Sequence, residues 1–201
     1  NRQNAYHREY SRLESLRNLT ERYDGYGNSI RRVMEQKSRE PKILGVVADL
    51  IKVDKKYETA VEIALGGSIQ NIVTADEETA KKMIGYLKQN RYGRATFLPL
   101  TAIRGGQGFV RAEALREPGV IGTADKLVTV EDKFTSLAEH LLGRTLVADN
   151  IDIGIRLARK YRQSLRIVTL EGDLINPGGA MSGGAFKNSS NLLSRRREIE
   201  E

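Results

Sequence analysis

An internal duplication constrains the fold of this chain more than any other feature of its 201 residues. With a shift of 77 positions, GVVADLIKVDKKYETAVEIALG at residues 45–66 lies over GTADKLVTVEDKFTSLAEHLLG at residues 122–143 without a gap. The match resumes after a deletion of a few residues, in the pairs IVTAD (72–76) with LVAD (146–149) and RATFL (94–98) with RIVTL (166–170). Because glycine and apolar positions agree throughout, we expect two copies of one folding unit.

Each copy has the pattern of a small unit of strands and helices. A short apolar strand precedes a helix whose apolar residues share one face, such as Tyr57, Val61 and Leu65. A second strand, a second amphipathic helix and a closing strand follow. The second strands are expected at residues 69–74 and 145–148. The predicted fold class is therefore mixed α/β, with two related lobes.

Glycines and aspartates mark the ends of the expected helices. Gly66 and Gly143 follow the first helix of each copy, where a glycine takes the positive φ of a helix C-cap. Asp76 and Asp149 precede the second helix, where a carboxylate accepts hydrogen bonds from the free N–H groups of the first turn. We expect these structural roles for all four residues and no catalytic role for the aspartates.

Both ends of the chain carry helical patterns that no terminal signal closes. Residues 1–22 contain no glycine or proline and have apolar residues at spacings of three, four and seven, as in an amphipathic helix or a short coiled coil. The run SSNLLSRRREIEE at residues 189–201 restarts a helical pattern. We therefore expect a segment of a longer protein, inserted between two long helices.

These patterns divide the chain into five parts. The RGGQG run and Pro118 lie between the two copies and indicate a linker. The expected parts are an incoming coiled-coil stub and junction helix (1–40), a first lobe (41–100), the linker (101–121), a second lobe that carries a glycine motif (122–186) and the start of an outgoing coiled coil (187–201).

The glycine motif NPGGAMSGG at residues 176–184 admits several interpretations. A phosphate-binding P-loop requires G-x-x-x-x-G-K-[ST], and Gly184 and Ala185 occupy its Lys and Ser/Thr positions, so this interpretation is excluded. The motif instead follows a short strand and a proline, as at a sheet edge. Glycines there let another backbone approach closely, and in a two-lobed fold the natural partner is a second copy of the chain.

The sequence lacks the residue patterns of most catalytic and metal sites. It contains no cysteine and no G-x-S-x-G motif, and its two histidines, His7 and His140, have no second metal ligand nearby. RGGQGFVR at residues 104–111 fails the G-x-G-x-x-G fingerprint. No apolar run approaches the roughly 18 residues of a membrane span. We expect no catalytic residue, metal, cofactor or membrane segment.

Basic residues form the strongest binding signal after the glycines. The formal net charge is +7, which favours polyanionic partners. Cations gather at residues 81–94 and 156–166 and at both junctions with the flanking helices. Some of them complement helix dipoles, an alternative that explains the last helical turn but not whole clusters. The candidates for phosphate contact are Arg31, Arg32, Lys88, Arg91, Arg94, Lys187, Arg195, Arg196 and Arg197.

Three runs carry a resemblance to a known family. They are YDGYGNSIRRVM, ALGGSIQNIVTADEETAKKMIGYLKQNRYGRATFLPL and LEGDLINPGGAMSGG, in that order. The chain closely resembles, over essentially its whole length, the hinge domain of bacterial SMC (structural maintenance of chromosomes) proteins.

The resemblance implies a non-enzymatic module within a long, cytoplasmic, nucleoid-associated ATPase. In that family two antiparallel coiled-coil arms run from the hinge to distant ATP-binding heads, where kleisin-type subunits bind. The hinge forms a homodimer, and the paired glycines at its contact match Gly178, Gly179, Gly183 and Gly184. It also binds DNA without sequence preference through basic residues that include Lys187. Residues 188–190 are Asn-Ser-Ser where some relatives carry lysines, which favours weaker DNA binding or a role for other cations.

One alternative remains open at this point. An α/β enzyme that handles nucleic acid or nucleotides would also use basic helices and glycine-rich loops. Evidence for such an enzyme would be a ligand bound near RGGQG or measurable turnover. The sequence supplies no catalytic group for such an activity.

Overall fold

The computed structural model describes residues 2–10, 26–106, 109, 111–185 and 193. Residues 2–10 are helical, and the remainder of the two predicted coiled-coil stubs lies largely outside the described residues. Within the described ranges, no helix is long and apolar enough to cross a membrane.

The first copy begins after a helix, α2 (Asn28–Glu35), that joins it to the incoming segment. Its elements are β1 (Ile43–Val46), α3 (Val47–Leu50), β2 (Lys52–Val53), η1 (Lys55–Tyr57), α4 (Glu58–Leu65), η2 (Gly66–Gln70), β3 (Ile72–Thr74), α5 (Glu77–Asn90) and β4 (Phe97–Pro99). The predicted strand at 69–74 starts only at Ile72, because the preceding residues form the 3₁₀ turn η2.

The second copy follows the linker and the short helix η3 (Ala112–Arg116). Its elements are β5 (Val120–Thr123), η4 (Ala124–Leu127), β6 (Val128–Thr129), η5 (Asp132–Phe134), α6 (Thr135–Leu142), β7 (Thr145–Ala148), α7 (Ile151–Lys160), β8 (Arg166–Thr169), β9 (Leu174–Ile175) and β10 (Met181–Ser182). The predicted strand at 145–148 has the expected bounds.

The two copies share one strand topology. β1 is antiparallel to β3, which is parallel to β4, and β5, β7 and β8 repeat this arrangement. Both antiparallel pairs have a register irregularity at the equivalent glycines, Gly45 and Gly122. The second copy adds β9 and β10, which gives the sheet order β10-β9-β8-β7-β5. The mixed α/β class is therefore confirmed.

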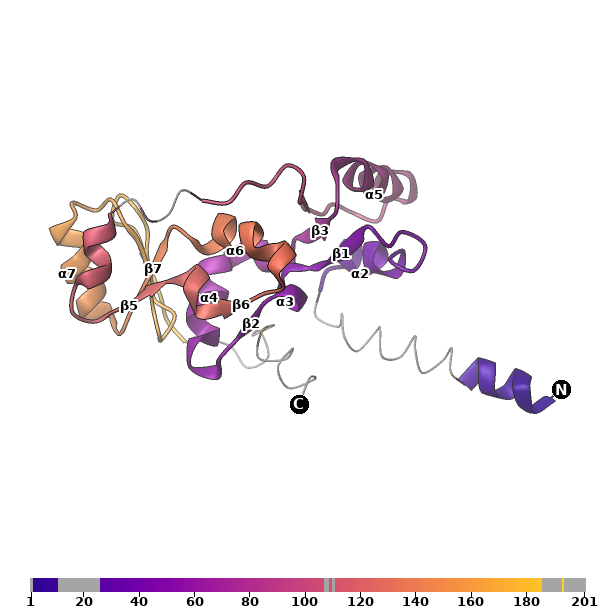
Figure 1. Ribbon diagram of the computed structural model, residues 1–201, viewed down its shortest axis with the longest axis horizontal. Helices are drawn as coiled ribbons and strands as arrows, with labels where there is room; N and C mark the ends of the chain where they lie inside the picture. Colours follow the sequence, from indigo (N-terminus) through magenta and orange to yellow (C-terminus); the bar gives the residue numbers. More distant parts are fainter. Residues whose placement is uncertain (1, 11–25, 107–108, 110, 186–192, 194–201) are drawn as a thin grey trace.

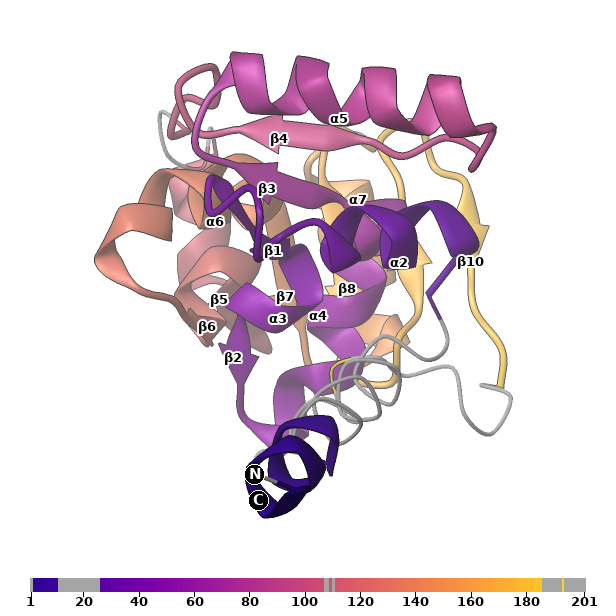
Figure 2. The ribbon, with the colours of Figure 1, turned by 90° about the vertical axis from the view of Figure 1, so that its right-hand side faces the viewer.

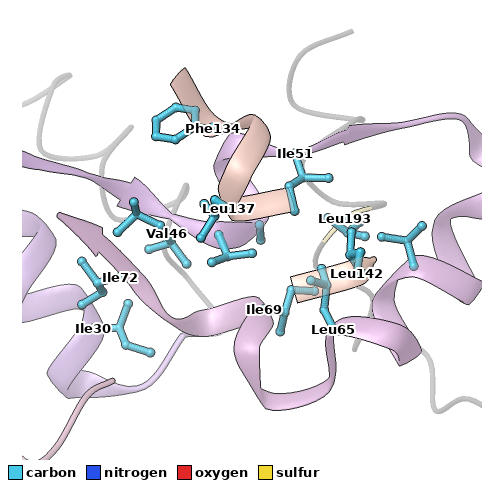
Figure 3. Packing of buried hydrophobic residues seen from close by; sticks show 14 of the residues in the cluster. Ile30, Val46, Ile51, Leu65, Ile69, Ile72, Phe134, Leu137, Leu142 and Leu193 are labelled. Atoms are coloured by element: carbon cyan, nitrogen blue, oxygen red, sulfur yellow. The ribbon is translucent and has the colours of Figure 1, made fainter. Parts of the chain in front are cut away.

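The copies are joined through a common core. Figure 1 shows α4 and α6 between the two sheets, and β2 pairs with β6 across the copies. Ile30, Val46 and Ile72 from the first part of the chain lie in one cluster with Leu137 and Leu142 from the second copy (Figure 3). A smaller cluster, which includes Leu146, Leu157 and Ile167, lies between α7 and the larger sheet.

The helix ends of the two copies are less alike than the sequence predicts. Gly66 has the predicted positive φ of +56°, but the prediction for Gly143 is wrong, since its φ is −68°. Asp76 caps α5 as expected and accepts a hydrogen bond from the Thr79 amide at 2.8 Å. The prediction for Asp149 is wrong: Asn150 is the N-cap of α7.

Candidate dimer edge and basic surface

The glycine motif forms a hairpin at the edge of the larger sheet. β9 and β10 pair antiparallel, with Met181 opposite Ile175, and β10 is the last strand of that sheet. The turn is closed by the Asn176 amide, which donates to the Ala180 carbonyl at 2.9 Å. The Gly178 amide donates to the Gln163 carbonyl at 2.7 Å, which fastens the turn to the loop after α7.

Glycine is favoured at the four positions of the motif for two different structural reasons. Gly178, Gly179 and Gly184 have φ values of +96°, +104° and +134°, which favour glycine strongly. At Gly183 an added Cβ would lie 2.5 Å from Asp173 Oδ1. No atom lies within 4 Å of a Cβ added at Gly178 or Gly184, so the outer side of the hairpin is open. The hairpin itself thus accounts for part of the glycine content.

β10 presents an exposed edge. Residues 180–185 are all exposed, and the Met181 side chain is 53% exposed. A strand edge of this kind offers unpaired backbone groups to another chain. Met181 and Ser182, which the sequence left without an assigned role, form this edge strand.

The first copy has an edge at the equivalent position. In the second copy β8 is flanked by β7 and β9, whereas its equivalent β4 pairs only with β3 among the described strands. Phe97, Leu98 and Pro99 of β4 are half-buried. β10 and β4 thus end the two larger sheets on corresponding sides, while β5 and β1 end them on the other side (Figure 2).

Five of the predicted phosphate-binding residues come together where α2 packs against α5. The Arg32 guanidinium lies 4.6 Å from the Tyr92 ring centroid, and Gln36 Nε2 donates to the Tyr86 hydroxyl at 3.3 Å. A Cβ added at Gly93 would lie 3.7 Å from Ser29 Cβ. The start of α2 thus lies beside the segment after α5, and this basic surface consists of Arg31, Arg32, Lys88, Arg91 and Arg94.

These cations differ in their freedom to bind an anion. Arg31, Lys88, Arg91 and Arg94 are exposed and make no ion pair with any residue that the structure describes. Arg32 is half-buried and lies 3.7 Å from Glu35. The other four predicted residues, Lys187, Arg195, Arg196 and Arg197, lie outside the described residues.

Several cations on and after α7 bond within the chain, as Lys82 of α5 does to Glu40, unlike Lys88, Arg91 and Arg94 of the basic surface. Lys160 and the Tyr161 hydroxyl both donate to Glu117 in the linker, and the Lys160 hydrogen bond is the main cause that lowers the pKa of Glu117. Arg166 donates to the Ala64 carbonyl at 3.0 Å, which links the two copies. Several of these cations therefore make hydrogen bonds between segments that are far apart in the sequence.

Gln163 is a hairpin contact that sequence reasoning missed. Its carbonyl accepts a hydrogen bond from the Gly178 amide. Its side chain would lie 3.6 Å from a Cβ added at Gly179. It has a φ of +59°, and nothing in the residue type signals this role.

The chain matches known proteins both in sequence and in fold. A family model described as "SMC proteins Flexible Hinge Domain" matches residues 40–158. The chain belongs to the SMC hinge family. This family model describes a hinge and not a catalytic domain, in agreement with the lack of catalytic motifs in the sequence.

Curated relatives of this hinge are chromosome partition proteins named Smc. Those of Desulfitobacterium hafniense and Bacillus subtilis are each 45% identical, over 196 and 194 residues. Each alignment covers 95% of this chain but only 16% of the relative. The chain thus corresponds to about one sixth of these relatives' length.

Solved hinge structures have the same fold. The asymmetric dimer of the Geobacillus stearothermophilus SMC hinge domain is 37% identical with a TM-score of 0.82, and the match covers 98% of this chain and 80% of that one. The Pyrococcus furiosus SMC hinge domain is 32% identical with a TM-score of 0.65, with 88% and 96% covered.

Proposed function

We propose that this hinge forms a homodimer in which β10 of each subunit lies beside β4 of the other. The observation that carries the proposal is that β10 is exposed, is followed directly by Gly183 and Gly184, and ends the larger sheet on the side that corresponds to β4 in the smaller one. A two-fold axis that brings β10 to the partner's β4 produces the same contact twice, so both edges are covered and the assembly closes. The Geobacillus stearothermophilus relative, whose structure is described as an asymmetric dimer, supports dimerisation itself.

The glycines Gly178, Gly179, Gly183 and Gly184 test the dimer contact. Their replacement by alanine adds four methyl groups and strains the hairpin, so we expect analytical ultracentrifugation to show a shift from dimer to monomer. Circular dichroism controls for loss of the fold. A folded quadruple variant that stays dimeric would contradict the proposal.

The wider role proposed for the hinge is mechanical. In a full-length chromosome-organising ATPase, the dimer would join two coiled-coil arms that leave side by side, so that a ring encloses DNA. The ATP-binding heads and the kleisin-type subunits bound to them would lie at the far ends of these arms. Such a protein would act in the cytoplasm on the nucleoid. The chromosome partition names of the relatives support this role.

We further propose that the hinge contacts DNA without sequence preference, through the basic surface and through Lys187, Arg195, Arg196 and Arg197. Four cations of the basic surface are exposed and unpaired among the described residues, so phosphate groups would displace only water and counterions from them. The surface includes the start of α2, where the incoming segment joins the first copy.

Charge reversal tests the DNA proposal. The triple variant Lys88→Glu, Arg91→Glu, Arg94→Glu should weaken retardation of short DNA at low salt. A matched control with the same change of net charge is Lys55→Glu, Lys56→Glu, Lys133→Glu, at exposed lysines of η1 and η5. The variant Lys187→Glu, Arg195→Glu tests the junction patch separately. If a variant retards DNA as strongly as the unmodified protein does, the residues changed in that variant are not part of the DNA contact.

A further inference from the structure

The loop after α7 holds two consecutive residues in a strained backbone conformation. Arg162 and Gln163 have φ values of +56° and +59°, in the left-handed region that residues with a side chain seldom adopt. Among the described residues, Arg91 at the end of α5 is the other non-glycine residue with a positive φ. Such strain persists only where the surrounding contacts impose it, so it requires a structural or functional reason.

The end of α7 explains the strain at Arg162 but not the strain at Gln163. α5 and α7 end with the same backbone hydrogen bond, which an amide donates to the carbonyl five positions earlier, at 3.0 Å from Tyr92 and at 2.7 Å from Gln163. One left-handed residue is enough for this ending, and it is Arg91 in α5 and Arg162 in α7. Tyr92 does not have a positive φ, so the left-handed conformation of Gln163 is specific to the second copy.

The second copy is also the one that carries the glycine hairpin, and Gln163 contacts the turn of that hairpin in two ways. Its carbonyl accepts the hydrogen bond from the Gly178 amide at 2.7 Å. Its side chain lies beside Gly179, since its Oε1 would be 3.6 Å from a Cβ added there. Because the backbone dihedrals of a residue set the direction of its carbonyl, the left-handed conformation directs this acceptor toward the turn.

The pairing of β9 with β10 is too short to fix the direction of β10 by itself. It consists of two residue pairs, and a two-stranded ladder of this kind has little stability of its own. Residues 180–185 are all exposed, so burial against other described segments contributes little. The hydrogen bond between Gln163 and Gly178 therefore helps to set how β10 extends from the sheet.

We propose that Gln163 is a positioning residue of the dimer contact, which holds the hairpin turn so that β10 lies beside the partner's β4. This inference rests on the proposed homodimer. The hydrogen bond to the turn comes from the backbone of Gln163, so the conformation at this position matters more than the side chain. A residue that disfavours the left-handed conformation should therefore weaken the dimer, although it lies outside the glycine motif and outside both strands.

Sedimentation velocity across a concentration series tests this role through the dissociation constant of the dimer. Gln163→Val should raise the dissociation constant about tenfold or more, because a β-branched residue disfavours the left-handed conformation and the carbonyl then turns away from Gly178. Gln163→Gly and Gln163→Asn should keep most of the affinity, because both residues adopt this conformation readily. Thermal melts of each variant verify that the fold is intact.

Arg162→Val is the matched control. It introduces the same strain one residue earlier, at an exposed side chain, and no hydrogen bond joins Arg162 to the described part of the hairpin. We expect it to lower the melting temperature but to change the dissociation constant much less than Gln163→Val does. Hydrogen exchange of the Gly178 amide gives a second reading, because loss of its acceptor should speed exchange in Gln163→Val and not in Arg162→Val.

The results separate the role of Gln163 from the homodimer itself. An unmodified protein that is monomeric would overturn the homodimer and, with it, this role. If the unmodified protein is a dimer, an unchanged dissociation constant in Gln163→Val would overturn the role of Gln163 alone. An equal rise in Arg162→Val, or equal exchange of the Gly178 amide in the two valine variants, would overturn it as well.

Discussion

At the residue scale, Asp76 holds the start of α5 in place. Its carboxylate accepts hydrogen bonds from the Thr79 amide at 2.8 Å and hydroxyl at 2.7 Å, and from Lys42 Nζ at 3.1 Å. The Thr79 donors are the main cause that lowers the pKa of Asp76 from 3.8 to about 2, and Lys42 adds to them. The charged form is thus favoured in the folded state.

Asp76→Ala should lower the midpoint of thermal unfolding by a few degrees at pH 7, because the first turn of α5 loses its cap. Since the folded pKa is the lower one, this contribution is complete above about pH 4 and is lost as the pH falls toward 2. Melting curves of the variant and the unmodified protein should therefore converge between these pH values. A difference that persists unchanged at pH 2 would contradict this role.

The second copy provides the matched control at Asp149 and Asn150. Asn150 Oδ1 accepts the Ile153 amide at 3.0 Å, whereas Asp149 is exposed and outside the cap. Asn150→Ala should cost about 1 kcal/mol of unfolding free energy in a urea titration, and Asp149→Ala much less. A loss on Asp149→Ala as large as that on Asn150→Ala would contradict the assignment of the cap to Asn150 alone.

At the scale of elements, β10 is a short strand with a large apolar side chain on an open edge. Met181 is 53% exposed in one subunit, although it lies in a strand that continues a five-stranded sheet. Exposed apolar edges are normally blocked by charge or covered by a partner. In the proposed dimer, the β4 edge of the second subunit covers it.

Met181→Lys should raise the dissociation constant of the dimer about tenfold or more, because a charged side chain replaces an apolar one at the covered edge. Sedimentation velocity across a concentration series measures the change. This variant leaves the glycine backbone unaltered, so hairpin strain does not affect the result. Leu115→Lys, at another exposed apolar residue that lies in η3, is the control and should not alter the dimer.

At the scale of the whole molecule, the two copies form one unit. α4 of the first copy and α6 of the second contribute to one apolar cluster, and the β2–β6 pair and the Arg166 hydrogen bond to Ala64 also join the copies. Leu193, beyond the glycine motif, is buried in the same cluster (Figure 3). The larger of the two apolar clusters is therefore built from both copies.

Leu142→Ala should destabilise both copies together, by about 2–5 kcal/mol, because Leu142 is fully buried in the shared cluster. Calorimetry should show a single transition, and hydrogen exchange should report the same loss of protection in α4 and α6. Leu115→Ala, at an exposed site, should change stability little. Two separate transitions would contradict a common core.

Much of the fold and part of the candidate site were predictable from the sequence. The repeated order of elements and the place of the glycine motif at a sheet edge follow from apolar spacing and turn residues, which act over a few positions. The caps at Gly143 and Asp149 were predicted wrongly. Residues at equivalent positions of the two copies do not necessarily make the same hydrogen bonds. The cations Arg156, Lys160 and Arg166 resemble Lys88, Arg91 and Arg94 in sequence, yet they bond to residues 38 to 102 positions away.

Residue order and local backbone preference are enough to predict the mixed α/β class and the place of the glycine motif at a sheet edge, and the three runs quoted above are enough to suggest the family. The folded chain was needed to show that the copies share one core, that β10 and β4 end their sheets on corresponding sides and that Arg31, Lys88, Arg91 and Arg94 are exposed. The physical reason is distance along the chain. Burial and ion pairing arise between segments that only folding brings together, and no local pattern specifies which segments those are.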